Sequence, residues 1–280
     1  MPTFDTPGPI TVTASLILAD VHITAGERAE TVVDVRPGNN AARSARMAEQ
    51  TRVEFADGRL RVHTPKQLRS WLGSNPGRLA VEIQVPAGSR LDGDSQMGDL
   101  IVDGDLGDCR YKTGYGEIRL GRTGRLRINT GSGDVTVDRV AGDAELTTGN
   151  GRLRVNHVDG AAVLKSSNGD TWIGEVTGAA RVNTANGEIA VERAVAGVTA
   201  KTANGRLRVG EAVSGQVVLQ TAAGRIEIGI PTGTAAWLDL DAGHGTVRNT
   251  LDGSNGPADS DRTVEVRAHT YYGDIVVSRA

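Results

Sequence analysis

The side chains best suited to chemistry in this sequence are five histidines, and none has the spacing of a metal or catalytic motif. Two of them, His244 and His269, occur near the C-terminus with Asp241, Tyr271 and Tyr272, the one polar and aromatic concentration in the chain. A metal or small ligand could bind such a group, but packing within the last repeat of the fold explains it more simply. We therefore treat the group as a candidate interaction surface and expect no metal and no cofactor.

A row of acidic residues is the second candidate, because paired carboxylates carry out glycoside hydrolysis. These residues recur at the same point of successive repeats: Asp99, Glu117, Asp134, Asp170 and Glu188. A neighbouring column holds Arg119, Arg154 and Arg208, so the row has the pattern of a solvated face of mixed charge. We predict no enzyme activity and keep a carbohydrate-active enzyme as the most remote alternative.

Three single residues complete the candidates. Cys109 shares a column with small and aliphatic residues and is expected to be an inert core thiol. Trp172 points outward by alternation and could anchor a sugar or a protein, although a ring lying across its neighbours is the favoured interpretation. Trp237, with Leu238 beside it, is expected to close the end of the core.

These side chains are positioned by an internal repeat marked by glycine. One glycine series recurs at intervals of mostly 18 residues and becomes irregular towards the C-terminus: Gly98, Gly116, Gly133, Gly151, Gly169, Gly187, Gly205, Gly224, Gly245 and Gly273. A second series lies about halfway between: Gly107, Gly124, Gly142, Gly160, Gly178, Gly197, Gly215 and Gly233. Two series with the same period predict a repeat of two short segments.

Each glycine precedes a short run in which apolar and polar residues alternate, as in Arg206-Leu207-Arg208-Val209. Alternation with a period of two predicts a strand with one buried face. Equivalent strands of successive repeats must pair in parallel because the turns between them are tight. The predicted fold is therefore all-β, a single-stranded parallel β-helix (β-solenoid) with coils of about 18 residues, and right-handed by the general preference for that crossover.

Two polar columns are expected to be structural ladders that fix the register. An inward column of hydroxyls stands three residues before the first glycine series: Thr130, Thr148, Ser166, Thr184, Thr202 and Thr221. An asparagine column stands one residue before it: Asn150, Asn168, Asn186 and Asn204. We expect the hydroxyls to bond from coil to coil and the asparagines to stack.

The two ends of the chain differ from the middle. Residues 1–90 are predicted to form an irregular β cap and opening coils, with one short helix near 41–50, and residues 91–280 the regular solenoid with a loop insertion near 249–262. The chain finishes on Asp274, Ile275, Val276 and Val277, with no helix to cover that strand. An uncovered strand edge tends to pair, so we expect a contact surface there, unless the inserted loop folds over it.

Composition and charge restrict the classes of partner that we expect the protein to bind. Aromatic residues make up only 3% of the chain and the formal net charge is −3, without a basic cluster, so no nucleic-acid binding is expected. There is no apolar run long enough to cross a bilayer and no signal-peptide pattern at the N-terminus. We therefore expect no membrane insertion and a cytoplasmic location, with an extracellular location as the alternative.

The repeated Thr-x-Asn-Gly-x-(Ile/Leu)-x-Val units, the stretch Lys165–Val176 and the Gly-Asp-Ile at 273–275 resemble a bacterial β-strand-repeat family known as “putative adhesins”, a domain family of unknown function. The opening residues and Glu49–Glu54 resemble its actinobacterial members, here of a cytosolic type. The resemblance covers essentially the whole chain and implies a β-solenoid without catalytic residues or cofactor.

The favoured function is a non-enzymatic scaffold that binds a protein partner or self-associates, the latter as a homo-oligomer through its C-terminal edge. The alternative is an adhesin-like module that binds carbohydrate or a cell-envelope polymer. The location of the protein in the cell and the identity of the molecule that binds to it distinguish these two functions.

Overall fold

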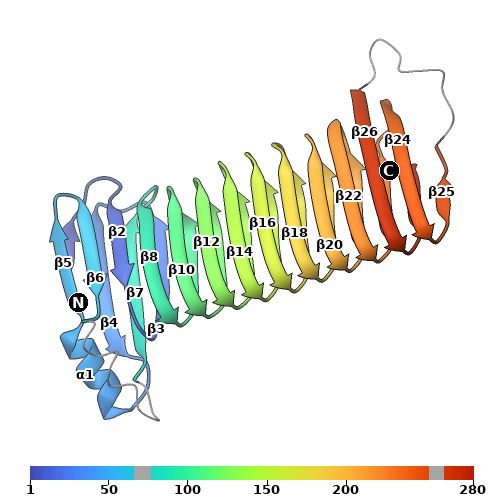
Figure 1. Cartoon of the computed structure of the whole chain (residues 1–280). Helices are drawn as coiled ribbons and strands as arrows, with labels where there is room; N and C mark the ends of the chain where they lie inside the picture. Colours follow the sequence, from blue (N-terminus) through green and yellow to red (C-terminus); the bar gives the residue numbers. More distant parts are fainter. Residues whose placement is uncertain (66–76, 252–261) are drawn as a thin grey trace. The chain divides into compact units, whose positions relative to one another are not determined.

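The structure is a computed structural model that describes residues 1–65, 77–251 and 262–280. These residues form two compact units, Met1–Asp138 and Arg139–Ala280, and each is built almost entirely of strands (Figure 1). The one helix in the described ranges, α1 (Ala42–Gln50), lies in the only segment for which the sequence predicts a helix. The predicted loop insertion near 249–262 falls mostly on residues 252–261, outside the described residues.

In the second unit, each coil gives one strand to each of two sheets. One sheet contains, in sequence order, β15 (Leu153–Val158), β17 (Thr171–Val176), β19 (Ile189–Ala194), β21 (Leu207–Ala212), β23 (Ile226–Ile230), β25 (Val247–Asn249) and β27 (Ile275–Arg279). The other contains β14 (Ala144–Asn150), β16 (Ala162–Asn168), β18 (Ala180–Asn186), β20 (Val198–Asn204), β22 (Gly215–Ala223), β24 (Thr234–His244) and β26 (Arg262–Tyr272). The pairs are parallel and in register, with equivalent residues of successive coils side by side, which confirms the predicted β-solenoid.

The first unit has the same two-sheet plan. One sheet contains β1 (Thr3–Asp5), β3 (Ala19–Gly26), β4 (Glu30–Pro37), β7 (Leu79–Pro86), β9 (Leu100–Asp105) and β11 (Ile118–Thr123). The other contains β2 (Thr11–Ser15), β5 (Arg52–Ala56), β6 (Arg59–His63), β8 (Arg90–Met97), β10 (Cys109–Tyr115) and β12 (Leu126–Ser132). The division between the units falls within β13 (Val135–Val140).

The core consists of the inward members of each alternating strand. In β21, Leu207 and Val209 are buried, while Arg208 between them lies in a more accessible position. Because the chain has so few aromatic residues, aliphatic side chains and threonines fill the layer between the sheets. Tyr111 is the largest fully buried side chain, and its ring lies where a Cβ on Gly93 would stand. Gly93, which belongs to neither glycine series, thus leaves room in the core for the ring of Tyr111.

The hydroxyl column is buried as predicted. The predicted bond from hydroxyl to hydroxyl joins Ser95 to Thr113 at 3.0 Å, whereas other members of the column bond to backbone carbonyls. The hydroxyls of Thr130, Thr148 and Thr184 donate to backbone carbonyls two residues ahead, each at 3.2 Å. Those of Thr221 and Thr270 donate to glycine carbonyls of the adjacent coil. The column therefore satisfies the backbone of the corner, where strand pairing is interrupted.

The asparagine column is a ladder, as predicted. Asn168 donates from its side-chain amide to that of Asn150 at 2.8 Å, and Asn186 and Asn204 continue the series at 2.9 Å per step. Asn168 and Asn186 each donate to one neighbour and accept from the other, an arrangement that requires the same register in successive coils. The ladder lies on the surface of the corner between the two sheets.

The N-terminal end of the first unit is closed by antiparallel strands. β4 pairs with β7, β1 pairs with β4, and β5 pairs with β6, all antiparallel. Phe4 of β1 and Phe55 of β5 bring their rings within 5.1 Å of each other. The edge strands that remain, β1 and β5, have only three and five residues, and short edges limit unwanted pairing.

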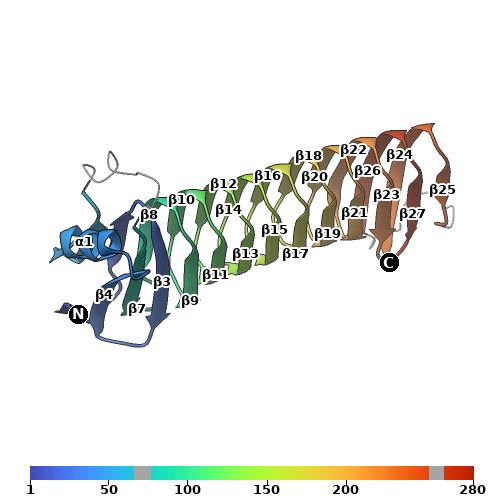
Figure 2. The same ribbon diagram turned by 90° about the horizontal axis from the view of Figure 1, so that it is seen from below.

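The C-terminal coil does not lie at the end of the second unit, which corrects the prediction of an uncovered last strand. β26 pairs with β22 on one side and β24 on the other, and β27 pairs with both β23 and β25 (Figures 1 and 2). The coil made of β24 and β25 comes earlier in the sequence but stands outside it. The glycine series is therefore ordered Gly205, Gly224, Gly273, Gly245 in space, so its last two members are reversed relative to the sequence.

Candidate interaction surface

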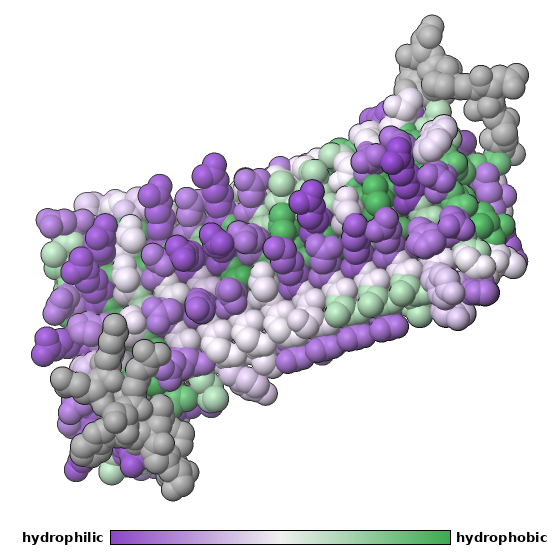
Figure 3. All heavy atoms as spheres, viewed as in Figure 1, coloured by the Kyte–Doolittle hydropathy of each residue, from purple (hydrophilic) through white to green (hydrophobic). Residues whose placement is uncertain are grey.

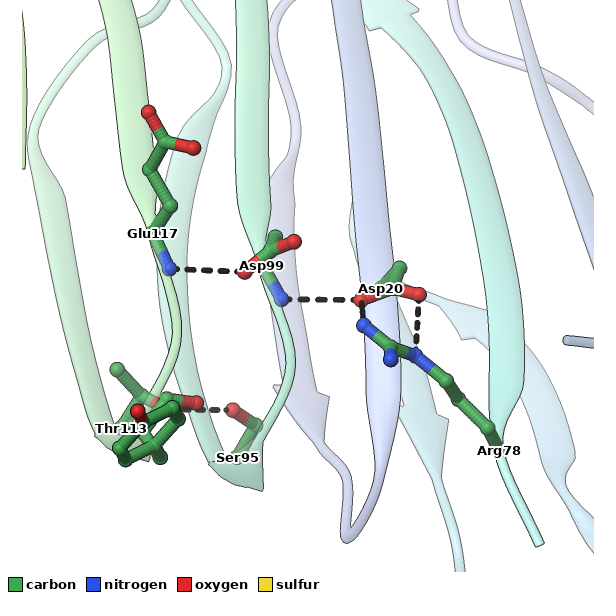
Figure 4. A network of polar contacts seen from close by, with 7 residues as sticks. Asp20, Arg78, Ser95, Asp99, Thr113 and Glu117 are labelled. Atoms are coloured by element: carbon green, nitrogen blue, oxygen red, sulfur yellow. Dashed lines mark hydrogen bonds and ion pairs between the residues drawn. The ribbon is translucent and has the colours of Figure 1, made fainter. Parts of the chain in front are cut away.

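The acidic column has a structural task that the sequence analysis missed. Figure 4 shows the carboxylate of Asp20 accepting the N–H of Asp99 at 3.1 Å, and that of Asp99 accepting the N–H of Glu117 at 2.8 Å. Asp20 is itself bound by Arg78. Asp170 repeats the contact in the second unit, accepting the N–H of Glu188 at 2.8 Å. These aspartates hold successive coils together at the corner, which is a structural reason for their recurrence.

Trp172 points outward as predicted, but it is engaged by its neighbours. The guanidinium carbon of Arg154 lies 4.0 Å from the ring centroid, which is cation–π geometry. The ring N–H donates to Glu192 at 3.2 Å, and Glu192 also accepts from Arg208 at 2.7 Å. The ring therefore lies across neighbouring side chains, in agreement with the favoured interpretation, and is only partly exposed.

Cys109 is fully buried, and burial raises the pKa of its thiol to about 12, with a smaller contribution from Asp92. The prediction of an inert core thiol agrees with this environment, because the reactive thiolate is suppressed. No group of histidine, cysteine or acidic residues able to hold a metal ion occurs within the described ranges.

Three rings form a cluster that we call the aromatic corner: His244, Tyr271 and Tyr272. His244 stacks on Tyr272 with ring centroids 5.0 Å apart, and Tyr271 stands edge-on to both, at 5.2 and 4.7 Å. Tyr271 and Tyr272 are 51% and 56% exposed. The structure thus brings together three of the residues predicted as an interaction surface, on strands that are 28 residues apart in sequence but adjacent in the sheet.

His269 adjoins this corner on the same face of β26. Its Nδ1 lies 2.9 Å from a carboxylate oxygen of Asp241, its register partner on β24. Both side chains are exposed, so the pair presents a charged group beside the rings. The aromatic corner and this hydrogen-bonded pair together place rings and hydrogen-bonding groups on one face.

The other predicted surface residues do not belong to this face. Ile275 and Val277 are completely buried in β27, between β23 and β25. The carboxylate of Asp274 accepts the backbone N–H and the hydroxyl of Thr246, both at 2.9 Å. Thr246 lowers the pKa of Asp274, through its N–H first and its hydroxyl second. Asp274 thereby ties β25 to the coil beneath it, and Val276 lies in the same paired strand.

The outermost coil exposes a long strand that the sequence analysis did not identify as a surface. β24 has 11 residues and, among the strands of the described residues, pairs only with β26. Trp237 is 57% exposed and points outward, near Arg267, so the expectation that it closes the core is wrong. Leu238 and Leu240 face inward but remain partly accessible. Figure 3 shows hydrophobic side chains among hydrophilic ones at this end.

Within the described residues, no helix is both long enough and apolar enough to cross a membrane.

Comparison with known proteins places residues 10–278 in the family model described as Toastrack DUF4097. No curated protein matches the chain. Among solved structures, a “putative lipid binding protein” from Parabacteroides distasonis is 14% identical, covers 99% of this chain and 96% of its own, and has a TM-score of 0.43. A “putative adhesin” from Parabacteroides merdae is 9% identical over 99% and 95%, with a TM-score of 0.44. A “putative cell adhesion protein” from Clostridium sporogenes is 12% identical over 100% and 98%, with a TM-score of 0.22.

Proposed function

The chain belongs to the Toastrack DUF4097 family, and we propose that it is a non-enzymatic scaffold that binds a protein partner through the aromatic corner. The observation that carries the proposal is the exposure of Tyr271 and Tyr272 on a regular, paired sheet. Tyrosine is enriched at protein interfaces because its ring supplies contact area and its hydroxyl a hydrogen bond.

The mutual packing of the three rings favours binding. Each ring is already held by the other two, so a partner would immobilise little additional side-chain freedom on contact. β26, which carries Tyr271 and Tyr272, pairs along its length with β22 on one side and with β24 on the other. The corner is therefore a pre-organised surface on a rigid support.

A non-enzymatic role is supported by the way the outward carboxylates are used. Asp99 and Asp170 accept backbone N–H groups of the next coil, and Glu192 accepts from Arg208 and Trp172. Carboxylates committed to such contacts are poorly placed to move protons on a substrate.

The test is capture of partners by purified protein from the native host, with Tyr271→Ala/Tyr272→Ala as the deficient variant. Tyr115→Ala is the matched control, because Tyr115 is exposed to a similar extent, 59%, and lies in the equivalent corner column of the first unit. A captured protein is then purified and titrated against the wild type, the double variant and Tyr115→Ala. We expect loss of binding only in the double variant, whereas equal binding by all three contradicts the proposal. Light scattering of the protein alone reports self-association through the same surface.

Carbohydrate binding is the second candidate, favoured by the position of the Asp241–His269 pair beside the exposed ring of Tyr271. Sugar rings stack on aromatic faces while carboxylates accept hydrogen bonds from their hydroxyls. A glycan array probed with the wild type and Tyr271→Ala tests this candidate: binding that depends on Tyr271 supports it, and an array without Tyr271-dependent binding rejects it.

We place the protein in the cytoplasm, with the extracellular side as the alternative that a surface-binding role would require. Fractionation of the native host separates the two, since an adhesive function demands that the protein be found outside the membrane.

A further inference from the structure

The outer side of β24, which we call the open edge, has a defined pattern of backbone groups. The carbonyl of Gly233 accepts the N–H of Arg262 in β26, and Thr234 and Arg262 are register partners. Since backbone groups of successive residues in a strand point to opposite sides, the odd-numbered residues of β24 face β26. The N–H and C=O groups of Ala236, Leu238, Leu240 and Ala242 therefore face the open edge.

The side chains along the open edge alternate between apolar and acidic character. Leu238 and Leu240 point towards the core and are partly accessible, because no further coil covers them within the described residues. Trp237, Asp239 and Asp241 point outward and are exposed. An added strand would meet aliphatic side chains on its inner face, and two carboxylates and an indole ring on its outer face.

We propose that the open edge binds an extended segment of a partner protein in which arginine or lysine alternates with aliphatic residues. The aliphatic positions would cover Leu238 and Leu240, and the basic positions would pair with Asp239 and Asp241 across the strands. An arginine could also stack on Trp237. The second unit already contains such a strand: in β21, Leu207 and Val209 are buried and Arg208 pairs with a carboxylate, Glu192 of β19.

Charge argues against a second copy of β24 as the occupant. Two β24 strands side by side would bring Asp239 and Asp241 of one copy close to those of the other, and like charges on facing strands are destabilising. The acidic residues thus disfavour pairing of the edge with itself while they favour a basic strand. The length of the edge, 11 residues, contrasts with the three and five residues of the edge strands in the first unit.

This inference rests on the proposed function, since it names the chemistry of the partner at the adjoining surface, and a peptide assay tests it. The probe is a labelled peptide in which arginine alternates with valine, and the control peptide has glutamate in place of arginine. Fluorescence anisotropy with the full chain is expected to show binding of the arginine peptide, at least 10-fold tighter than the glutamate peptide and weakened by salt.

Two variants locate the site. Leu240→Pro removes an N–H that faces the open edge and leaves the hydrogen bonds to β26 intact. It should therefore reduce the affinity for the arginine peptide more than 10-fold. Leu240→Ala is the matched control for loss of the side chain. Asp239→Lys/Asp241→Lys should abolish binding without touching the backbone, which keeps the test valid if the proline variant unfolds.

The proposal would be overturned by equal binding of both peptides, by no binding of the arginine peptide, or by unchanged affinity in the lysine variant. It would also be overturned if the wild type dimerised with rising concentration and the lysine variant did not. Failure here is distinguishable from failure of the proposed function. Partner capture that depends on Tyr271 and Tyr272 can persist when the peptide does not bind. Conversely, the peptide can bind to the open edge when no partner is captured through these two tyrosines.

Discussion

The close approach of glycines in successive coils makes one substitution especially informative, Gly187→Ala. Gly187 has φ = 139°, a conformation almost restricted to glycine. A Cβ there would lie 2.3 Å from the carbonyl oxygen of Gly169 in the adjacent coil. The substitution therefore combines backbone strain with a collision between two backbones, and neither can be relieved by a side-chain rotation.

The cost follows from these two effects. Strain at such a φ costs about 1–3 kcal/mol. Relieving the collision to 3.0 Å requires the coils to separate by about 0.7 Å. The bonds that join these two coils at the corner, from Gly169 N–H to Asn186 and from Thr171 N–H to Glu188, are 2.9 and 2.8 Å long, so such a separation breaks them at about 1 kcal/mol each. We expect a loss of at least about 3 kcal/mol in the free energy of unfolding.

The matched control is Gly233→Ala in the same unit. Gly233 has φ = 76°, but a Cβ there meets nothing within 4 Å, so only strain of about 1–2 kcal/mol is expected. Both substitutions reduce the entropy of the unfolded chain alike, and that effect cancels in the comparison. Guanidinium unfolding followed by circular dichroism measures both. Equal destabilisation of the two variants would refute the argument from close approach.

Three further predictions follow from single side chains. Thr171→Val should raise the free energy of unfolding by about 1 kcal/mol in a urea titration, because the buried hydroxyl of Thr171 has no hydrogen-bond partner among the described residues and lies beside Ile189. Cys109 should react with a thiol reagent at pH 8 only after denaturation, since burial raises its pKa to about 12; rapid reaction in the folded state would show the thiol to be accessible. Because its contacts with Thr246 lower the pKa of Asp274, its stabilising effect should be complete above the unfolded pKa of about 3.9 and lost as pH falls through the folded value. The protection factors of the β25 amides, taken relative to the intrinsic exchange rate at each pH, should therefore fall in acid, and Asp274→Asn should remove that pH dependence.

The repeat could be predicted from sequence because each coil carries the same local signals. Glycine, threonine and asparagine recur in register, and strand alternation assigns each side chain to the inner or outer face. The buried position of Thr148 and the ladder through Asn168 are direct consequences of that periodicity. A pattern that repeats in every coil reliably predicts that coils stack.

The order of the coils could not be predicted in the same way. Identical register signals fit any neighbour, so the sequence does not indicate that β26 inserts between β22 and β24. One feature of the sequence does distinguish the outermost coil: Ala242 takes the place of threonine opposite Thr270. A coil with a neighbour on only one side has less need of the hydroxyl column.

The aspartate contacts were missed for a different reason. Alternation correctly puts Asp99 and Asp170 on the outside, but it does not reveal that a short carboxylate reaches the N–H of the next coil. The interaction surface was predicted in part. His244, Tyr271 and Tyr272 do come together, whereas Ile275 and Val277 are buried because the last strand has neighbours on both sides.

Hydrogen exchange of β24, with and without a purified partner obtained by capture, tests the central claim that the outermost coil and its aromatic corner are the binding surface. In the free protein, the amide of Leu240, which faces the open edge, should exchange rapidly, while that of Asp239, which faces β26, should be protected. The partner should slow exchange at Leu240 and leave Asp239 unchanged. Protection confined to the first unit or to the asparagine ladder, with Leu240 still exchanging rapidly, would contradict the account.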